Sequence, residues 1–334
     1  MKKILILEAN SNQAMAIAKY IKMYSDYLII GAIEKNRKFI RNNFDKIVIS
    51  KLSGIDIKQY DYILPMGAGS TYNFISKYKK LNYNNGIFFS KDNLIVFDKP
   101  KMLNIANETN IPIPKTYLDK NDIKDFPIFY KEDFENGGGT RGVAYNKDTI
   151  PNKSSLIYQE YINTPSTYGV GFLAKNGKIE TFFIHKEMVS YPIDGGSSVA
   201  IKKFYDKRLI EYTEKLIKKL NYNGWGLAEY KYCNKRDDFV FMEINAKFWA
   251  SIEFMLMNNN QFLSKLLDIK YQNKKIERVL FINRFFQYDL KDMFTNLKYL
   301  LYIPYIRESS IIYQITRKFI PNIFVDFVKR VKNV

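Results

Sequence analysis

Short apolar runs alternate with helical patterns along the first 97 residues of the chain. Four runs have the length and the apolar content of buried strands: residues 4–7, 28–33, 46–50 and 62–65. Between the first two runs, residues 13–23 carry apolar side chains at helical spacing. Strands that are separated by helical segments are typical of a parallel α/β sheet. We therefore predict a Rossmann-like domain over residues 1–97.

The pattern changes after this region. A helix is predicted to start at Asp98, because Asp is a favourable cap and Pro100 fits the first turn. It should end before the Ile-Pro-Ile-Pro segment at residues 111–114, since proline disfavours helical backbone in the residue before it. Strand-like runs then surround a glycine-rich loop, at residues 127–131, 143–145 and 156–162. We predict a small subdomain over residues 98–175.

Further strands and one clear helix are predicted in the next hundred residues. Apolar residues recur at helical spacing between residues 207 and 220, and Asn223-Gly224 ends this pattern. We predict a second subdomain over residues 176–270. The remaining residues, 271–334, form a basic and aromatic C-terminal extension with 12 Lys or Arg and 5 Asp or Glu residues.

The segment at residues 239–247 carries the clearest chemical pattern in the chain. It reads as a strand, and the side chains of a strand alternate between two faces. One face is predicted to be apolar, with Val240, Met242 and Ile244. The other face is predicted to be polar, with Glu243, Asn245 and Lys247.

A second strand-like run, residues 226–231, precedes this segment, with a polar turn between the two. A hairpin centred on Arg236 places Glu229 opposite Glu243 on the same face. Two like charges in this position destabilise a hairpin, unless a cation lies between them. Carboxylate and amide oxygens suit Mg²⁺. We predict a metal site formed by Glu229, Glu243 and Asn245, although exposed acidic residues on hairpins are also common.

The glycine-rich loop at residues 137–142, Gly-Gly-Gly-Thr-Arg-Gly, is the second chemical signal. It lacks the Gly-Lys-Ser/Thr sequence and the following helix of a Walker loop. A strand-to-strand loop with exposed N–H groups can still cover phosphates, although glycine-rich loops are often only turns. Lys131 ends the preceding strand, where its charge could balance a triphosphate.

Composition narrows the alternatives. The formal net charge of +18 is spread along the chain and no nucleic-acid-binding motif accompanies it, so no nucleic-acid partner is expected. There is one histidine, His185, and one cysteine, Cys233, which leaves little material for a zinc site or a Cys–His nucleophile pair. We assign no function to either residue. The first strand-to-helix turn lacks the G-x-G-x-x-G sequence of dinucleotide-binding proteins, which disfavours a nucleotide-dependent oxidoreductase.

The order of these motifs resembles the ATP-grasp superfamily, in particular its carboxylate–amine ligases and the large subunit of carbamoyl-phosphate synthase. The Glu-x-Asn element with its upstream acidic partner is the most specific part of the resemblance. The matching landmarks cover roughly residues 95–260, at 98–99, 111–114, 126–131, 137–143, 158–162, 195–197, 224–229 and 242–248. The resemblance implies an α/β (α+β) architecture, with a Rossmann-like preATP-grasp domain followed by a two-subdomain ATP-grasp fold.

The resemblance also implies a role for each matching residue. ATP would bind with its phosphates against Lys99 and Lys131, and Lys131 and Lys247 would be the catalytic residues. The glycine-loop residues implied in ATP binding are Gly137, Gly138, Gly139, Thr140 and Gly142. The residues implied in the adenine pocket are Glu160, Tyr161 and Ile162. The implied ligands of Mg²⁺, with Mn²⁺ as a substitute, are Glu229, Glu243 and Asn245.

Three further features complete the comparison with the superfamily. Residues 195–198 would border the acceptor site. Lys247 stands where the family commonly has arginine, so the charge is kept and the bidentate fork is lost. Thr167 stands where the family often has an acidic contact to ribose.

We therefore expect an ATP- and Mg²⁺-dependent ligase that joins a small-molecule carboxylate to an amine through an acyl phosphate. The alternatives are a phosphotransferase that releases a phosphorylated small molecule, and a non-catalytic nucleotide-binding relative. The lone cysteine and the lack of a long apolar stretch lead us to expect a cytoplasmic protein. Residues 319–331 could form a basic amphipathic helix, which would make weak contact with a membrane surface or pack on the core.

Overall fold

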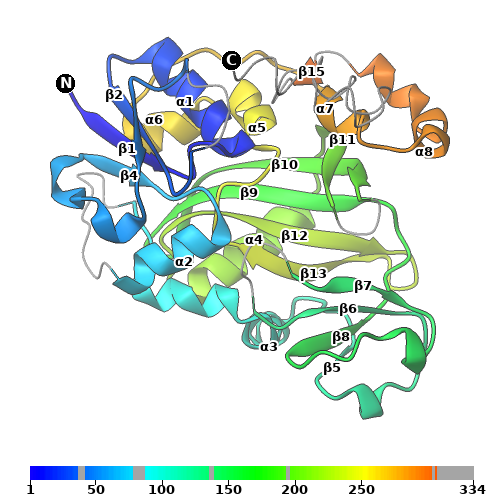
Figure 1. Cartoon of the computed structure of the whole chain (residues 1–334). Coiled ribbons are helices and arrows are strands. Elements are labelled where there is room, and N and C mark those ends of the chain that lie inside the picture. Colours follow the sequence, from blue (N-terminus) through cyan, green and yellow to red (C-terminus); the bar gives the residue numbers. More distant parts are fainter. Residues whose placement is uncertain (37–41, 78–86, 135–138, 193–195, 303–304, 307–334) are drawn as a thin grey trace.

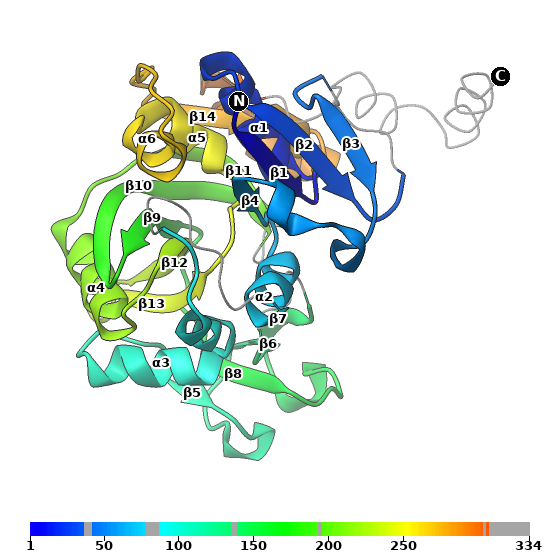
Figure 2. The ribbon, with the colours of Figure 1, turned by 90° about the vertical axis from the view of Figure 1, so that its left-hand side faces the viewer.

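A computed structural model describes residues 1–36, 42–77, 87–134, 139–192, 196–302 and 305–306. Its strands form three sheets, one in the N-terminal region and two in the remainder of the chain. In Figure 1 and Figure 2 the large sheet lies in the middle, with α1 and α6 above it and the small sheet and α3 below it. No helix in the described part of the chain is both long and apolar enough to cross a membrane.

The N-terminal sheet is parallel, as predicted. Its strand order is β3-β2-β1-β4, formed by β1 (Lys3–Leu7), β2 (Leu28–Ile33), β3 (Lys46–Ile49) and β4 (Tyr62–Leu64). Two helices accompany it, α1 (Asn12–Tyr24) and α2 (Ala68–Lys77). Ser11 caps α1, because its Oγ accepts a hydrogen bond from the Ala14 backbone N–H at 3.2 Å. The Rossmann-like character of this region is confirmed.

The small sheet is antiparallel and follows α3 (Lys99–Glu108). Asp98 caps this helix by accepting a hydrogen bond from the Lys101 backbone N–H at 3.0 Å, and Pro100 lies in its first turn. The strand order is β5-β8-β6-β7, formed by β5 (Thr116–Tyr117), β6 (Ile128–Glu132), β7 (Arg141–Ala144) and β8 (Leu156–Glu160). The glycine-rich segment therefore connects two paired strands, β6 and β7.

The large sheet has seven strands in the order β13-β12-β9-β10-β11-β14-β15. They are β9 (Thr167–Lys175), β10 (Lys178–Tyr191), β11 (Ser197–Lys203), β12 (Gly224–Cys233), β13 (Asp238–Asn245), β14 (Arg278–Phe281) and β15 (Tyr305–Ile306). Sheet membership changes between Glu160 and Thr167, earlier in the chain than the predicted boundary after residue 175. Within the predicted C-terminal extension, β14 and β15 belong to the large sheet.

Helices link the large sheet to the N-terminal domain. The amphipathic helix α4 (Lys207–Lys219) packs against β9 and β10. The shorter helices are α5 (Ile252–Asn258), α6 (Gln261–Leu267), α7 (Ile282–Phe285) and α8 (Leu290–Thr295). Across the domain junction, Lys19 of α1 forms an ion pair with Glu253 at 2.8 Å, and the Tyr27 hydroxyl donates to the Leu267 carbonyl at 2.8 Å. One continuous apolar cluster therefore joins the N-terminal sheet to the large sheet.

Candidate active site

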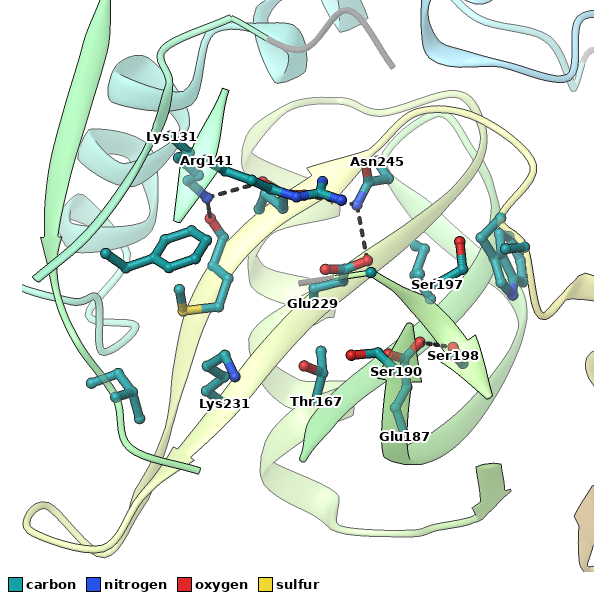
Figure 3. A pocket seen from close by; sticks show the side chains of 18 of the residues that line it. Lys131, Arg141, Thr167, Glu187, Ser190, Ser197, Ser198, Glu229, Lys231 and Asn245 are labelled. Atoms are coloured by element: carbon teal, nitrogen blue, oxygen red, sulfur yellow. Dashed lines mark hydrogen bonds and ion pairs between the residues drawn. The ribbon is translucent and has the colours of Figure 1, made fainter. Parts of the chain in front are cut away.

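A cavity of about 550 Å³ brings most of the predicted site residues together. Its walls come from β6, β7 and β8 of the small sheet and from β9 to β13 of the large sheet, as Figure 3 shows in part. The predicted residues that line it are Lys99, Lys131, Gly139, Thr140, Glu160, Tyr161, Ile162, Glu229, Glu243, Asn245 and Lys247. Gly142 lies in β7 opposite Tyr130 and does not line it. Gly137 and Gly138 lie outside the described residues.

The β12–β13 hairpin has the predicted pairing at the metal-site residues. Glu229 pairs with Glu243 across the two antiparallel strands. Toward the turn the register shifts by one residue, so that Tyr230 pairs with Phe241. Met242 is thus an extra residue on β13, which makes a β-bulge beside the two carboxylates.

The bulge changes which side chains share a face of β13. The predicted apolar face of Val240, Met242 and Ile244 is wrong. Val240 and Met242 pack with Ile162 in a small cluster, whereas Ile244 belongs to the main core. The bulge places the side chains of two consecutive residues, Met242 and Glu243, along the same cavity.

A buried polar network connects the two sheets at this point. Lys131 Nζ donates to Glu243 Oε2 at 2.9 Å and to the Met242 carbonyl at 3.3 Å. The Asn245 side-chain amide donates to Glu229 Oε1 and to Glu243 Oε1, both at 3.1 Å. The side chain of Lys131 is 9% exposed and that of Glu243 is 20% exposed, so solvent screens this ion pair only weakly. Figure 3 shows these contacts as dashed lines.

The two carboxylates differ in their affinity for protons. Burial raises the pKa of Glu243, but the positive charges of Lys131 and the other lysines nearby outweigh it and hold the pKa at about 2. Burial first, and then the negative charges of Glu243 and Glu187, raise the pKa of Glu229 to about 8. Glu243 is therefore the stronger acid of the two carboxylates, and Glu229 takes up a proton more readily.

The donor set of this network fits a divalent cation that prefers oxygen ligands. Glu229 and Glu243 present adjacent carboxylates, and their mutual repulsion is what a bound cation would relieve. Rotation of the Asn245 amide about χ2 would present its oxygen in place of its nitrogen. In the described part of the chain, no group of three or more His, Cys, Asp and Glu side chains is arranged to hold a metal ion. Such a site would therefore consist of two carboxylates and an amide.

Lys99 and Lys247 also line this cavity. Lys99 begins α3, and its backbone N–H donates to the Asp133 carbonyl at 2.8 Å, which ties the helix to the end of β6. Lys99 is only 5% exposed. Lys247 follows β13 directly, and its backbone N–H donates to the Asn245 carbonyl at 2.9 Å. Both lysines help to keep Glu243 ionised, so both lie within electrostatic range of the carboxylate pair.

The described end of the glycine-rich loop is fastened by Glu132. The carboxylate of Glu132 accepts a hydrogen bond from the Thr140 backbone N–H at 2.7 Å and forms an ion pair with Lys153. These donors, Lys153 first, lower the pKa of Glu132 to about 2. Gly139 has a φ of +114°, and a Cβ there would meet the Glu132 carboxylate. The positive φ thus favours glycine at this position, and a larger residue would also displace the Glu132 carboxylate.

The segment after β8 gives the cavity an apolar wall. Ile162 packs against Met242, and Phe129 and Val143 line the cavity from the small sheet. Glu160 also lines the cavity, but its carboxylate forms an ion pair with Arg236 and accepts from the Lys115 backbone N–H at 3.2 Å. A ligand would therefore meet this strand end mainly through its backbone and its apolar side chains.

Four charged residues that line the cavity were not among the predicted site residues: Glu132, Arg141, Glu187 and Lys231. Arg141 follows Thr140 in the glycine-rich segment, and Figure 3 shows its guanidinium reaching over the cavity between Lys131 and Asn245. Its charge inside a glycine-rich loop was a signal that could have singled it out. Glu187 of β10 lines the opposite side of the cavity, and an isolated acidic residue on a long strand gave no comparable signal.

No protein-family model matches this chain, and no curated protein matches its sequence. Solved structures match its fold. N5-carboxyaminoimidazole ribonucleotide synthetase from Thermotoga maritima aligns over 82% of this chain and 78% of its own, with 14% identity and a TM-score of 0.61. N5-carboxyaminoimidazole synthetase from Staphylococcus aureus, complexed with ADP, covers 81% and 79%, with 14% identity and a TM-score of 0.62. Biotin carboxylase from Campylobacter jejuni, in a β-γ-ATP complex, covers 81% and 71%, with 17% identity and a TM-score of 0.60.

These similarities show the fold. The chain has the ATP-grasp fold, with the N-terminal Rossmann-like domain that was predicted from the sequence. The cavity lies between the small sheet and the large sheet, and Glu243 and Asn245 of β13 line it.

Proposed function

We propose that this protein is an ATP- and Mg²⁺-dependent ligase that joins a carboxylate to an amine through an acyl phosphate. The single observation that carries the proposal is the network in which Lys131, from one sheet, meets Glu243, from the other, beside Glu229 and Asn245. This network brings together, in one cavity, a lysine whose charge suits a phosphate group and oxygen ligands that suit a metal ion. The names of the matching structures include two synthetases and a biotin carboxylase, which agrees with ligase chemistry.

The cavity offers a separate place to each part of ATP. The apolar wall of Phe129, Val143 and Ile162 suits the adenine ring. Lys99 and Lys131 would bind the phosphates by charge-assisted hydrogen bonds. Glu229, Glu243 and Asn245 would hold Mg²⁺, which supplies charge neutralisation at the phosphate oxygens.

The proposed reaction needs no nucleophile from the protein. A substrate carboxylate oxygen attacks the γ-phosphorus of ATP, the bond to ADP breaks, and an acyl phosphate forms. The amine nitrogen then attacks the acyl carbon, the bond to phosphate breaks, and the amine gives up its proton. Lys131 and Lys247 would stabilise negative charge on the transferred phosphoryl group and on the departing phosphate.

The first test is the thermal shift of the purified protein with ATP, with and without Mg²⁺. We expect stabilisation that depends on Mg²⁺, of about 2.7 kcal/mol when ATP exceeds its Kd about 100-fold. Glu243→Ala should abolish the shift. The matched control is Glu180→Gln, because Glu180 pairs with Lys265 at 3.0 Å and does not line the cavity. A folded protein without any shift would contradict the proposal and favour a degenerate relative.

Product analysis then decides the type of reaction. ATP is incubated with a panel of carboxylates and hydroxylamine, which traps an acyl phosphate as a hydroxamate. Hydroxamate together with ADP and inorganic phosphate is the expected result. A stable phosphorylated product in place of free phosphate would instead identify a phosphotransferase.

A further inference from the structure

Glu187 lies on the wall of the cavity that the nucleotide-binding residues do not use. It stands on β10, directly opposite Thr167 of β9, and its side chain is 16% exposed. The cavity wall beside it carries three hydroxyl groups, from Ser190, Ser197 and Ser198. In Figure 3, Glu187 lies on the far side of Glu229 from Lys131, close to Ser190 and Ser198.

Neutral or weakly basic groups hold one oxygen of Glu187 in place. The Ser198 hydroxyl donates to Oε1, and His185 Nε2 lies 3.7 Å from the same oxygen. His185 is itself buried and lies 3.4 Å from the Ser251 hydroxyl. Among the described residues, no polar partner is found for the other oxygen, Oε2.

A buried arginine, Arg284, holds strand β11, which carries Ser198, in place. Arg284 donates to the backbone carbonyl of Ser198 and, at 2.9 Å, to that of Ala250. It is 5% exposed. This contact locks the start of β11 to the segment after β13, so the Ser198 hydroxyl is presented to Glu187 in a fixed position.

We propose that Glu187 binds the amine substrate as its ammonium ion, so that the nucleophile is a primary amine that is cationic at neutral pH. Because an ammonium nitrogen has no lone pair, the bound group gives up one proton to solvent before its nitrogen attacks the acyl carbon, and a second proton as the amide forms and phosphate leaves. The inference rests on the proposed function and names the charge class of its second substrate. A carboxylate that loses water when the cavity fills requires a positive partner, because an uncompensated buried charge is costly. An ammonium group has three donors, and the carboxylate with the neighbouring serine hydroxyls offers acceptors for them.

A purely structural role is the competing explanation. Glu187 could serve only to hold β10 against β11 through Ser198. Glu187→Gln separates the two roles, because the amide keeps the shape and still accepts a hydrogen bond from Ser198, but loses the charge. Glu180→Gln is the matched control on the same strand, away from the cavity.

The experiment compares two kinds of nucleophile with ATP and a carboxylate that the wild-type protein activates. Hydroxylamine is uncharged near neutral pH, whereas glycinamide and ethylenediamine are mainly cationic. For Glu187→Gln we expect kcat/KM with the cationic amines to fall on the order of 10- to 100-fold, mainly through KM, since a charge-assisted hydrogen bond is lost. The rate of hydroxamate formation and KM for ATP should stay within about twofold of wild type, as should every parameter of Glu180→Gln.

Four results would overturn the assignment. Equal losses with hydroxylamine and with the amines would indicate a structural role. A change confined to KM for ATP would place Glu187 at the nucleotide. A wild-type protein that forms hydroxamate but uses no cationic amine would exclude this substrate class while the proposed ligase function stands. If neither hydroxamate nor amide forms, the ligase proposal itself fails, and this assignment fails with it.

Discussion

The two walls of the cavity differ in what fixes their charged groups. Glu229 stands on β12, which is paired on both sides within the large sheet and packs on the main apolar core. Lys131 stands on β6 of the small sheet, which is backed by a separate cluster of six buried apolar residues. The ion pair between Lys131 and Glu243 crosses from one wall to the other. This ion pair and the one between Glu160 and Arg236 therefore both tie the small sheet to the large sheet.

The largest expected effect comes from breaking that ion pair. Lys131→Met leaves Glu243 buried without its nearest cation, which should destabilise the protein by about 3 kcal/mol. Glu243→Gln removes the charge from the other side. Because the two side chains act as a pair, the double variant should be less destabilised than the sum of the single variants. Urea unfolding of the three variants measures the coupling.

Lys153→Met is the control for this cycle. Lys153 also pairs with a carboxylate, that of Glu132, but this contact lies at the exposed loop and does not join the two sheets. Its loss should change stability by about 1 kcal/mol or less. Strict additivity of Lys131→Met and Glu243→Gln would show that the cross-wall contact does not couple the sheets.

A smaller effect is expected from pH, and it separates the two carboxylates. The folded protein raises the pKa of Glu229 from 4.5 to about 8, so this group stabilises the fold below pH about 4.5 and loses that contribution as the pH rises toward 8. Glu243 behaves oppositely, because its lowered pKa gives stability above pH about 4.5 that is lost in acid. In chelator-treated protein, Tm should therefore fall between pH 5 and pH 8.

Glu229→Gln should flatten this dependence on pH, and Mg²⁺ with ATP should suppress it. Glu180→Gln, on the surface of the same sheet, should keep the wild-type slope. A slope that persists in Glu229→Gln would assign the titration to another group and remove the distinction between the two carboxylates.

The wall built on the large sheet was the easier one to predict. Strand alternation and one turn position were enough to place Glu229 opposite Glu243, and this pairing is confirmed. The bulge at Met242 was not predicted, because an extra residue in one strand leaves no mark in an apolar run. The faces of Val240 and Met242 were therefore assigned wrongly, although the pairing of the two carboxylates was right.

The other parts of the site depended on contacts between distant segments. Glu187 meets Ser198 because β10 and β11 pair in the sheet, with register shifts between Glu187 and Val189 and between Val189 and Ser190. Arg284 reaches Ser198 from 86 residues away in the chain. No local period or motif encodes such contacts. The resemblance did point to residues 195–198, of which Ser197 and Ser198 line the cavity, but nothing in the sequence singled out Glu187 or Arg284.

The contact between Glu132 and the glycine-rich loop gives a test with a smaller expected effect, on the cavity wall formed by the small sheet. Glu132→Gln weakens the hold on the Thr140 backbone N–H and removes the ion pair with Lys153. We expect KM for ATP to rise about 3- to 10-fold with little change in kcat, because only the ordering of the loop is affected. Steady-state ATP turnover measures this. A fall in kcat as large as the rise in KM would show that the loop acts in the chemical step. Both walls of the cavity would then take part in the reaction itself.

The smallest effect is expected from a region that belongs to neither wall. The predicted amphipathic segment at residues 319–331 lies outside the described residues, and we propose that it gives weak contact with an anionic membrane surface. The described chain before it already exposes large apolar side chains, since Leu290 is 59%, Phe294 71% and Leu301 71% exposed. Five large apolar residues of this kind lie between residues 290 and 301, more than a water-facing surface requires.

Removal of residues 315–334 should therefore abolish sedimentation with anionic liposomes at low salt. It should leave the Mg²⁺-dependent thermal shift with ATP unchanged, because the described residues that line the cavity all precede residue 252. Raising the salt concentration should weaken the sedimentation of the full chain, since the attraction between basic residues and anionic lipids is screened. Sedimentation that survives the truncation would assign the contact to the exposed strip at residues 290–301, and a lost thermal shift would show that the C-terminal segment supports the cavity after all.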